Sequence, residues 1–249
     1  MIKAIPNIVT LTNLFLGCVA VVMALQGDPH FAGLLIGLCA LLDFLDGFLA
    51  RILKAGSQLG QQLDSLADLI SFGLAPAAIL YYYMSYTPQI INGQGLNIVL
   101  PYAAFLIAVF SGLRLAIFNI DTRQTNDFIG LPTPANAMIF ASFPVVLAYG
   151  NQTGFIYLFI ANVVSSGWWL LALVLVFSWL LVSPIRMFSL KFKSLGWQPN
   201  HIRYIFIIAA LLLFILFQIN SAPLIAIFYI ILSVFRHITS AEDSAGSHQ

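Results

Sequence analysis

The sequence predicts an all-α integral membrane protein, a polytopic helix bundle with about eight transmembrane helices. Hydrophobic residues make up 61% of the 249 residues and charged residues only 8%, with a mean hydropathy of +0.97. This composition excludes an ordinary soluble domain. The apolar residues fall into runs of about 20, the helix length that crosses a hydrocarbon core of about 30 Å. A net charge of +1 gives no indication of a nucleic-acid partner.

Polar loops separate the apolar runs and give the bounds of the predicted spans. Residues 154–165 either lie at the membrane surface or continue a span. We expect residues 1–240 to form one membrane domain and the polar segment 241–249 to be a disordered tail. The predicted spans are 9–25, 32–53, 63–85, 98–120, 134–149, 167–185, 203–219 and 222–237.

Lysine and arginine predict the orientation, because they are enriched in the cytoplasmic loops of membrane proteins. With both termini inside, no lysine or arginine lies in an outer loop. Arg114 lies in the inner half of the fourth span. The other nine basic residues lie on the inner side: Lys3, Arg51, Lys54, Arg123, Arg186, Lys191, Lys193, Arg203 and Arg236. The ends of spans two and three therefore face the cytoplasm.

Four of the nine acidic residues lie in the stretch that joins spans two and three: Asp43, Asp46, Asp64 and Asp68. The first two are three residues apart and the last two are four apart, so each pair shares a helix face. A carboxylate in a membrane span costs roughly 2.5–3.5 kcal/mol on insertion scales. Four of them need cations, and all-oxygen ligands suit Mg²⁺, Mn²⁺ or Ca²⁺. Four carboxylates can hold two such ions, as in two-metal phosphoryl chemistry.

The residues beside these aspartates predict a site for a diphosphate. Gly47 and Ala50 leave space on the helix face, and Arg51 offers a fork of donors that suits phosphate. Gly60 is expected in the polar connection between the helices, where a positive φ can be needed. The alternative is a structural salt-bridge cluster of the aspartates with Arg51 and Lys54, but two cations cannot balance four anions.

The register Asp43-x2-Asp46-Gly47-x2-Ala50-Arg51-x8-Gly60-x3-Asp64-x3-Asp68 resembles the signature of the CDP-alcohol phosphatidyltransferases. The resemblance implies a CDP-diacylglycerol donor and two bound divalent ions, Mg²⁺ or Mn²⁺, with Ca²⁺ as a further candidate. It also implies transfer of the phosphatidyl group with release of CMP. It also implies Asp68 as the general base. A homodimer in a bacterial inner membrane, with the active site facing the cytoplasm, is implied as well.

The first span begins with PNIVTLTN, residues 6–13. One interpretation is helix capping, with Pro6 near the helix start and Asn7 as the N-cap. The other is that Asn7 and Thr10 contact the nucleotide or its diphosphate, since the stretch is similar to the equivalent one in the family. We therefore expect Asn7, Thr10, Gly47, Ala50, Arg51 and Gly60 to form the nucleotide and diphosphate site.

Residues 111–137 carry a second resemblance. The runs LRLAIFN and GLPTPANA are similar to bacterial phosphatidylserine synthases within the same family, which implies L-serine as the acceptor. A buried arginine needs an anionic partner, and for Arg114 the serine carboxylate, a lipid phosphate or an aspartate would serve. Thr133 and Asn136 either contact serine or only form a sharp turn. The basic segment 182–193 serves topology or binds anionic headgroups.

Two other functions remain open from the sequence. Glycerol 3-phosphate or inositol phosphate would use the same chemistry, although a phosphorylated acceptor calls for more basic residues near the site. An ion-coupled transporter would explain buried acids, but it does not explain Gly47, Ala50, Arg51 and Gly60 in fixed register. Cys18 and Cys39 lie in apolar runs and are expected to be buried free thiols.

Overall fold

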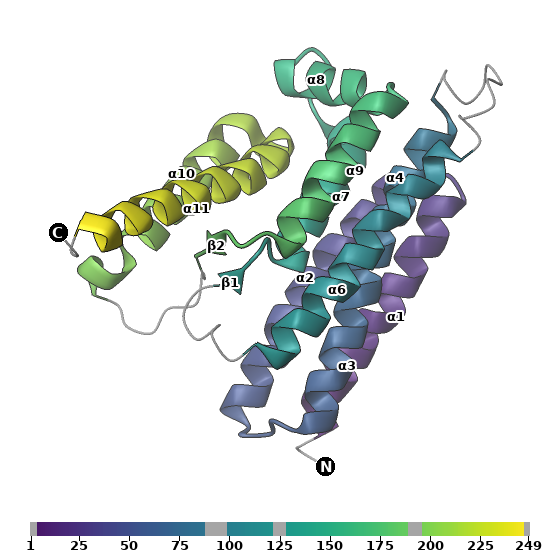
Figure 1. The fold of residues 1–249 in the computed structure, drawn as a ribbon. Coiled ribbons are helices and arrows are strands. Elements are labelled where there is room, and N and C mark those ends of the chain that lie inside the picture. Colours follow the sequence, from purple (N-terminus) through teal and green to yellow (C-terminus); the bar gives the residue numbers. More distant parts are fainter. Residues whose placement is uncertain (1–3, 88–98, 122–127, 189–195, 247–249) are drawn as a thin grey trace.

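The computed structural model describes residues 4–87, 99–121, 128–188 and 196–246, with only the backbone for 197–199 and 239–246. This part of the chain is nearly all helical (Figure 1). The helices are α1 (Ile5–Leu25), α2 (Pro29–Ile52), α3 (Gln58–Asp68), η2 (Leu69–Leu74), α4 (Ala75–Ser85), η4 (Leu100–Phe105), α6 (Leu106–Ile120), α7 (Thr133–Tyr149), α8 (Phe155–Val164), α9 (Gly167–Val182), α10 (Trp197–Phe217), η5 (Gln218–Asn220) and α11 (Ser221–Gly246). The strands are β1 (Phe128–Ile129) and β2 (Arg186–Met187).

The first three long helices form the base of the bundle. α1 and α2 are joined by a tight turn in which Gly27 has φ +99°, a conformation that favours glycine. α3, η2 and α4 run on as one helix of 28 residues, Gln58–Ser85. Its middle part, η2, is a π-helix that follows directly after Asp68. π turns inside α-helices are frequent at functional sites.

Small residues let these helices approach closely. A Cβ atom on Gly33 of α2 would collide with the backbone oxygen of Ala141 of α7. A Cβ on Gly17 of α1 would lie 2.6 Å from the Ser71 hydroxyl in η2. Ser71 also donates a hydrogen bond of 2.9 Å to Asn13 Oδ1. The π-helix is therefore locked against α1, and α2 against α7.

The second half of the chain folds around a short two-stranded ladder. β1 pairs with β2 in antiparallel orientation, which joins the segment before α7 to the segment after α9. α8 and α9 meet at an angle of 95°. The larger apolar core lies between α4, α7, α9 and α11, with Phe140, Leu170 and Met187 fully buried.

The helices α10 and α11 form a hairpin beside the main bundle (Figure 1). Gln218 begins the turn with φ +49°, which is uncommon for a residue with a side chain. α11 packs on α7 and on β2. The Tyr229 hydroxyl of α11 donates a hydrogen bond of 2.9 Å to the carbonyl of Phe188, the residue that directly follows β2.

These helices confirm the all-α polytopic membrane fold. Each of the eight predicted spans corresponds to a helix. By length and composition, the described residues contain five helical stretches able to cross a membrane, or six if the bent pair α8 and α9 is one span. The count is below eight because α7 has only 17 residues and because α10 to α11 count as one stretch of 39 residues.

Two local expectations differ from the structure. The N-cap of α1 is Ala4 and has no side-chain cap, so the capping interpretation of Asn7 is wrong. Cys39 is buried as expected, but Cys18 is exposed on the outside of α1. The backbone of α11 extends to Gly246, and the disorder of segment 241–249 stays a prediction.

Candidate functional site

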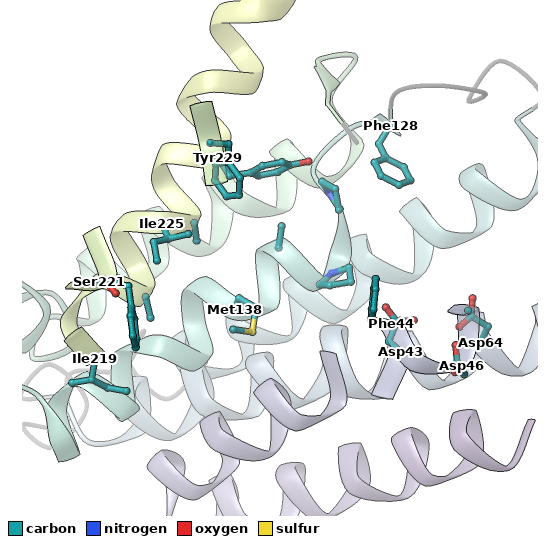
Figure 2. A pocket seen from close by; sticks show the side chains of 18 of the residues that line it. Asp43, Phe44, Asp46, Asp64, Phe128, Met138, Ile219, Ser221, Ile225 and Tyr229 are labelled. Atoms are coloured by element: carbon teal, nitrogen blue, oxygen red, sulfur yellow. The ribbon is translucent and has the colours of Figure 1, made fainter. Parts of the chain in front are cut away.

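Three aspartates from two helices form an acidic cluster where α2 meets α3. One carboxylate oxygen from each of Asp43, Asp64 and Asp68 lies within 4.8 Å of the other two. Asp43 belongs to α2, whereas Asp64 and Asp68 are one turn apart on α3. Figure 2 shows the side chains of Asp43, Asp46 and Asp64 close together at one end of a cavity. The predicted convergence of the two helix faces therefore occurs.

The acidic cluster has the donor chemistry of a divalent metal site. Carboxylates at this separation repel one another unless a cation lies between them. The Oδ1 atom of Asp68 is buried and has no hydrogen-bond partner among the described residues. Leaving a buried oxygen unpaired is costly, and a bound cation would remove that cost. The oxygen ligands fit Mg²⁺, Mn²⁺ or Ca²⁺.

Asp46, the fourth predicted ligand, lies beside this cluster and not within it. It is 5% exposed and accepts a hydrogen bond of 2.6 Å from the Thr10 hydroxyl of α1. Its charge still acts on Asp64 and Asp68. The structure therefore brings three of the four carboxylates together, and metal ligation by Asp46 stays a prediction.

Five of the six residues predicted to bind the nucleotide, all except Arg51, line one small cavity of about 140 Å³. Its walls come from α1, α2, α3 and the connection between α2 and α3. Nothing lies within 4 Å of a Cβ placed on Gly47, so this glycine leaves open space beside the acidic cluster. The lining includes Asn7, Thr10, Gly47, Ala50 and Gly60, together with Asp46 and Asp64.

Gly60 has a different structural role from the one predicted. It lies within α3 and not in the connection, and among the described glycines only Gly27 and Gly130 have a positive φ. A Cβ on Gly60 would lie 3.1 Å from Asn7 Oδ1, so glycine allows α1 and α3 to approach. The helix start is set by Ser57, whose hydroxyl accepts a hydrogen bond of 3.0 Å from the Gly60 amide. Serine is a favoured N-cap, so the sequence did carry this signal.

Arg51 extends from the last turn of α2 beside the same space. Its Nε donates a hydrogen bond of 2.9 Å to the Gly47 carbonyl, which holds the base of the guanidinium group. The side chain is exposed and lines the larger cavity described below. Arg51 therefore lines the same cavity as Asp43, Asp46 and Asp64, and its contact with an anionic ligand stays a prediction.

The predicted acceptor residues lie on α6 and α7. Arg114 is 6% exposed, and its Nη1 donates a hydrogen bond of 3.4 Å to the Thr133 hydroxyl. Its guanidinium lies 5.4 Å from the ring centre of Phe118 and 5.9 Å from that of Phe128. The charge of Arg114 also acts on Asp68. A buried cation in a membrane span needs an anionic partner, and Asp68 is one candidate for Arg114.

Several polar atoms near these residues have no hydrogen-bond partner in the described part of the chain. They are Nε of Arg114 and both amide atoms of Asn136, one turn after Thr133 on α7. Asn136 is fully buried. Buried polar groups are nearly always paired, so these atoms are candidates to bind a small polar ligand or water.

A second, larger cavity of about 1010 Å³ begins at the aspartates and was not predicted from the sequence. Asp43, Asp46, Asp64, Gly47 and Arg51 line its polar end. Figure 2 shows it extending along α7 and α11 past Met138 to Ile219 and Ser221. Its apolar walls carry no motif, because they arise from the packing of helices that are far apart in the sequence.

One contact between α6 and α3 near the site also escaped prediction. Asn119 at the end of α6 donates a hydrogen bond of 2.9 Å to the Ser65 hydroxyl, next to Asp64 on α3.

Arg186 from the predicted basic segment lies in β2 and is exposed, whereas Lys191 and Lys193 are outside the described residues. The role of that segment in topology or headgroup binding stays a prediction.

The chain is similar to known proteins of one family. Residues 3–180 match the family model described as CDP-alcohol phosphatidyltransferase. A CDP-diacylglycerol–serine O-phosphatidyltransferase from Mycobacterium leprae is 35% identical over 247 residues, covering 96% of this chain and 75% of the relative. One from Bacillus subtilis is 37% identical over 164 residues, covering 64% of this chain and 88% of the relative. An archaetidylserine synthase from Methanothermobacter thermautotrophicus is 33% identical over 144 residues, covering 56% of this chain and 57% of the relative.

Proposed function

This chain belongs to the CDP-alcohol phosphatidyltransferase family, and we propose that it transfers the phosphatidyl group of CDP-diacylglycerol to the hydroxyl of L-serine. The products are phosphatidylserine and CMP. The observation that carries this proposal is the acidic cluster of Asp43, Asp64 and Asp68 beside the cavity that holds the nucleotide-site candidates. Serine as the acceptor is supported by the names of the similar proteins from Mycobacterium leprae and Bacillus subtilis.

The acidic cluster is the proposed metal site. Asp43, Asp64 and Asp68, with Asp46 beside them, would hold two divalent ions. Divalent ions held there offset the charge of the diphosphate and stabilise the charge that develops during transfer. Support comes from the oxygen donors and from the buried, unpaired Oδ1 of Asp68. Mg²⁺ and Mn²⁺ are the proposed ions.

The remaining nucleotide contacts come from α1, α2 and α3. The open space at Gly47 and the small side chain of Ala50 admit the cytidine part beside the aspartates. Asn7 and Thr10 offer hydrogen bonds from the opposite wall. Arg51 donates to the phosphate of CMP, which carries the charge of the leaving group.

The acceptor approaches from the side of α6 and α7. Arg114 binds the serine carboxylate, and Thr133 and Asn136 hydrogen-bond to its polar groups. Asp68 accepts the proton of the serine hydroxyl as that oxygen bonds to the β-phosphorus, and the bond from this phosphorus to the CMP oxygen breaks. The hydrogen bond of Arg114 to Thr133 and the unpaired amide atoms of Asn136 support this placement, because they offer donors and an acceptor to a small polar ligand.

The cellular setting follows from the predicted topology. We propose that the chain lies in a bacterial inner membrane with both termini and the aspartates at the cytoplasmic face, where soluble serine and CMP can exchange. A homodimer is the proposed assembly. Residues 1–240 are the proposed catalytic domain.

CMP release by the purified chain in detergent tests the function. The donor is CDP-diacylglycerol with Mn²⁺ or Mg²⁺, and serine, glycerol 3-phosphate, inositol 1-phosphate or no acceptor is added in parallel. We expect release with serine only, and loss of release on chelation with EDTA. Release with another acceptor instead would refute serine as the substrate while keeping the chemistry. Monodisperse protein that binds Mn²⁺ but releases no CMP would favour the ion-coupled transporter.

A further inference from the structure

The larger cavity combines a charged end with a long apolar body. The carboxylates of Asp43, Asp46 and Asp64 and the side chain of Arg51 lie at one end. Ala135 and Met138 of α7 face Ile225 and Ala226 of α11 along the body. A soluble ligand such as serine or CMP would fill only the charged end. The shape and chemistry therefore match an amphiphile whose head is anionic and whose tail is a hydrocarbon chain.

The far end of this cavity is formed by the turn between α10 and α11. Gln218, Ile219 and Ser221 line it. Asn220, between them, is 7% exposed and packs so closely on Gly150 that a Cβ there would collide with Asn220 Oδ1. The turn is therefore clamped onto the C-terminal end of α7. From Pro134, near the aspartates, to Gly150, α7 rises about 24 Å at about 1.5 Å per residue.

We propose that this cavity receives an acyl chain of the donor lipid and that the clamped turn limits the length of that chain. The inference rests on the proposed function, since the diphosphate held at the aspartates determines where the lipid enters. Met138, halfway along the cavity in Figure 2, and Ile219 at its end are the proposed specificity-determining residues.

Length selection in a membrane has to work by exclusion. An acyl chain that leaves the bilayer for an apolar cavity exchanges one hydrocarbon environment for another, so each added methylene gains little. A chain too long for the cavity instead forces side chains and backbone apart. Overpacking of this kind corresponds to a penalty of about five- to 150-fold. The enzyme should therefore tolerate short chains and discriminate against those that reach the turn.

The test measures CMP release from CDP-diacylglycerols that differ only in acyl length, for example with 8, 12, 16 and 18 carbons. The measured quantity is the ratio of kcat/KM for the long donors to that for the shortest. Met138→Trp fills the middle of the cavity and should lower this ratio by at least about fivefold. Ile219→Ala enlarges the far end, at the turn, and should raise it for the longest donors. Ile215→Trp adds similar bulk on an exposed position of α10 outside the cavity and is the matched control.

The outcomes separate this inference from the proposed function. Opposite shifts of the ratio in Met138→Trp and Ile219→Ala, with no shift in Ile215→Trp, support it. Equal changes for all donors in both cavity variants overturn it while the reaction itself stands. If the unsubstituted protein releases no CMP from any donor, the proposed function fails and the inference with it. Each variant is first checked for monodisperse elution in detergent, and a repeat with Met138→Phe covers a Trp variant that does not fold.

Discussion

Thr10 on α1 donates a hydrogen bond to Asp46 on α2, with 2.6 Å between Oγ1 and Oδ2. Both side chains are buried. The same hydroxyl lies 3.0 Å from the Pro6 carbonyl, but its single proton can serve only one acceptor at a time. A charged acceptor forms the stronger hydrogen bond. Thr10 therefore holds the carboxylate of Asp46, which lies beside the acidic cluster.

Replacing this hydroxyl should weaken metal binding. Thr10→Val keeps the side-chain shape but removes the donor, and groups that orient metal ligands are typically worth 10- to 100-fold in metal affinity or activity. We expect a rise of about tenfold in the Mn²⁺ concentration that half-activates CMP release, with Thr10→Ser near the unsubstituted value. A raised KM for CDP-diacylglycerol at unchanged Mn²⁺ dependence would contradict this effect on metal binding and leave Thr10 as a nucleotide contact alone.

The acidic cluster should be essential for metal binding. Asp43→Asn and Asp64→Asn each remove a charged ligand, and metal stabilisation of the transition state is worth several kcal/mol, or about a thousandfold in rate. We expect no detectable turnover and no binding of Mn²⁺ followed by electron paramagnetic resonance. Full activity in either variant would show that the substituted aspartate is not a required metal ligand.

A substitution of Asp68 should abolish turnover without abolishing binding of the donor lipid. As the proposed general base, its carboxylate is worth about 10²- to 10⁴-fold in rate. Asp68→Asn is therefore expected to abolish turnover while the protein still binds CDP-diacylglycerol, measured by retention of radiolabelled donor. Loss of donor binding together with turnover would assign Asp68 to the metal site alone.

Gly47 offers a substitution whose effect reports on the ligand. No protein atom lies within 4 Å of an added Cβ, so Gly47→Ala should fold normally. The added methyl group projects into the space proposed for the cytidine part, and we expect a several-fold rise in KM for the donor. Gly33→Ala is the matched contrast, because its Cβ collides with the Ala141 backbone oxygen. That variant should lower the melting temperature, and equal thermal stability of the two would contradict the close approach of α2 to α7.

Arg114 and Thr133 should control the use of serine. Arg114→Lys keeps the positive charge but loses the planar fork of donors, and a hydrogen bond to a charged group is worth about 1.5–3 kcal/mol. We expect KM for serine to rise by about tenfold or more, with a smaller rise for Thr133→Val. The KM for CDP-diacylglycerol is the internal control. A change confined to the donor would place Arg114 at the lipid phosphate.

The site was largely predictable because its chemistry is local in sequence. Carboxylates at i, i+3 and i, i+4 on two consecutive helices meet when those helices pack together, as Asp43, Asp64 and Asp68 do. Buried charges in an apolar chain are also conspicuous, which is why Arg114 was identified. The contact of Arg114 with Thr133 across 19 residues is consistent with the predicted acceptor site.

The remaining features depend on packing between distant helices. Gly60 was assigned to the wrong element because the prediction assumed a positive φ. In the structure its φ is not positive, and the missing Cβ instead leaves room for Asn7 of α1. The 95° bend between α8 and α9 and the hairpin of α10 and α11 lie in continuously apolar sequence, where composition does not mark a change of direction. The large cavity is lined mainly by α2, α7, α10 and α11, and none of these helices encodes it alone.

The π-helix η2 affects how the length of this chain can vary. A π turn accommodates one residue more than an α turn, so losing one residue between Leu69 and Leu74 can restore a regular α-helix with both flanks in place. The same loss anywhere in α3 or α4 would rotate one half against the other by about 100°. We therefore expect related sequences to tolerate a gap of one position immediately after Asp68. Such a gap changes neither the spacing of the aspartates nor the buried face of α4.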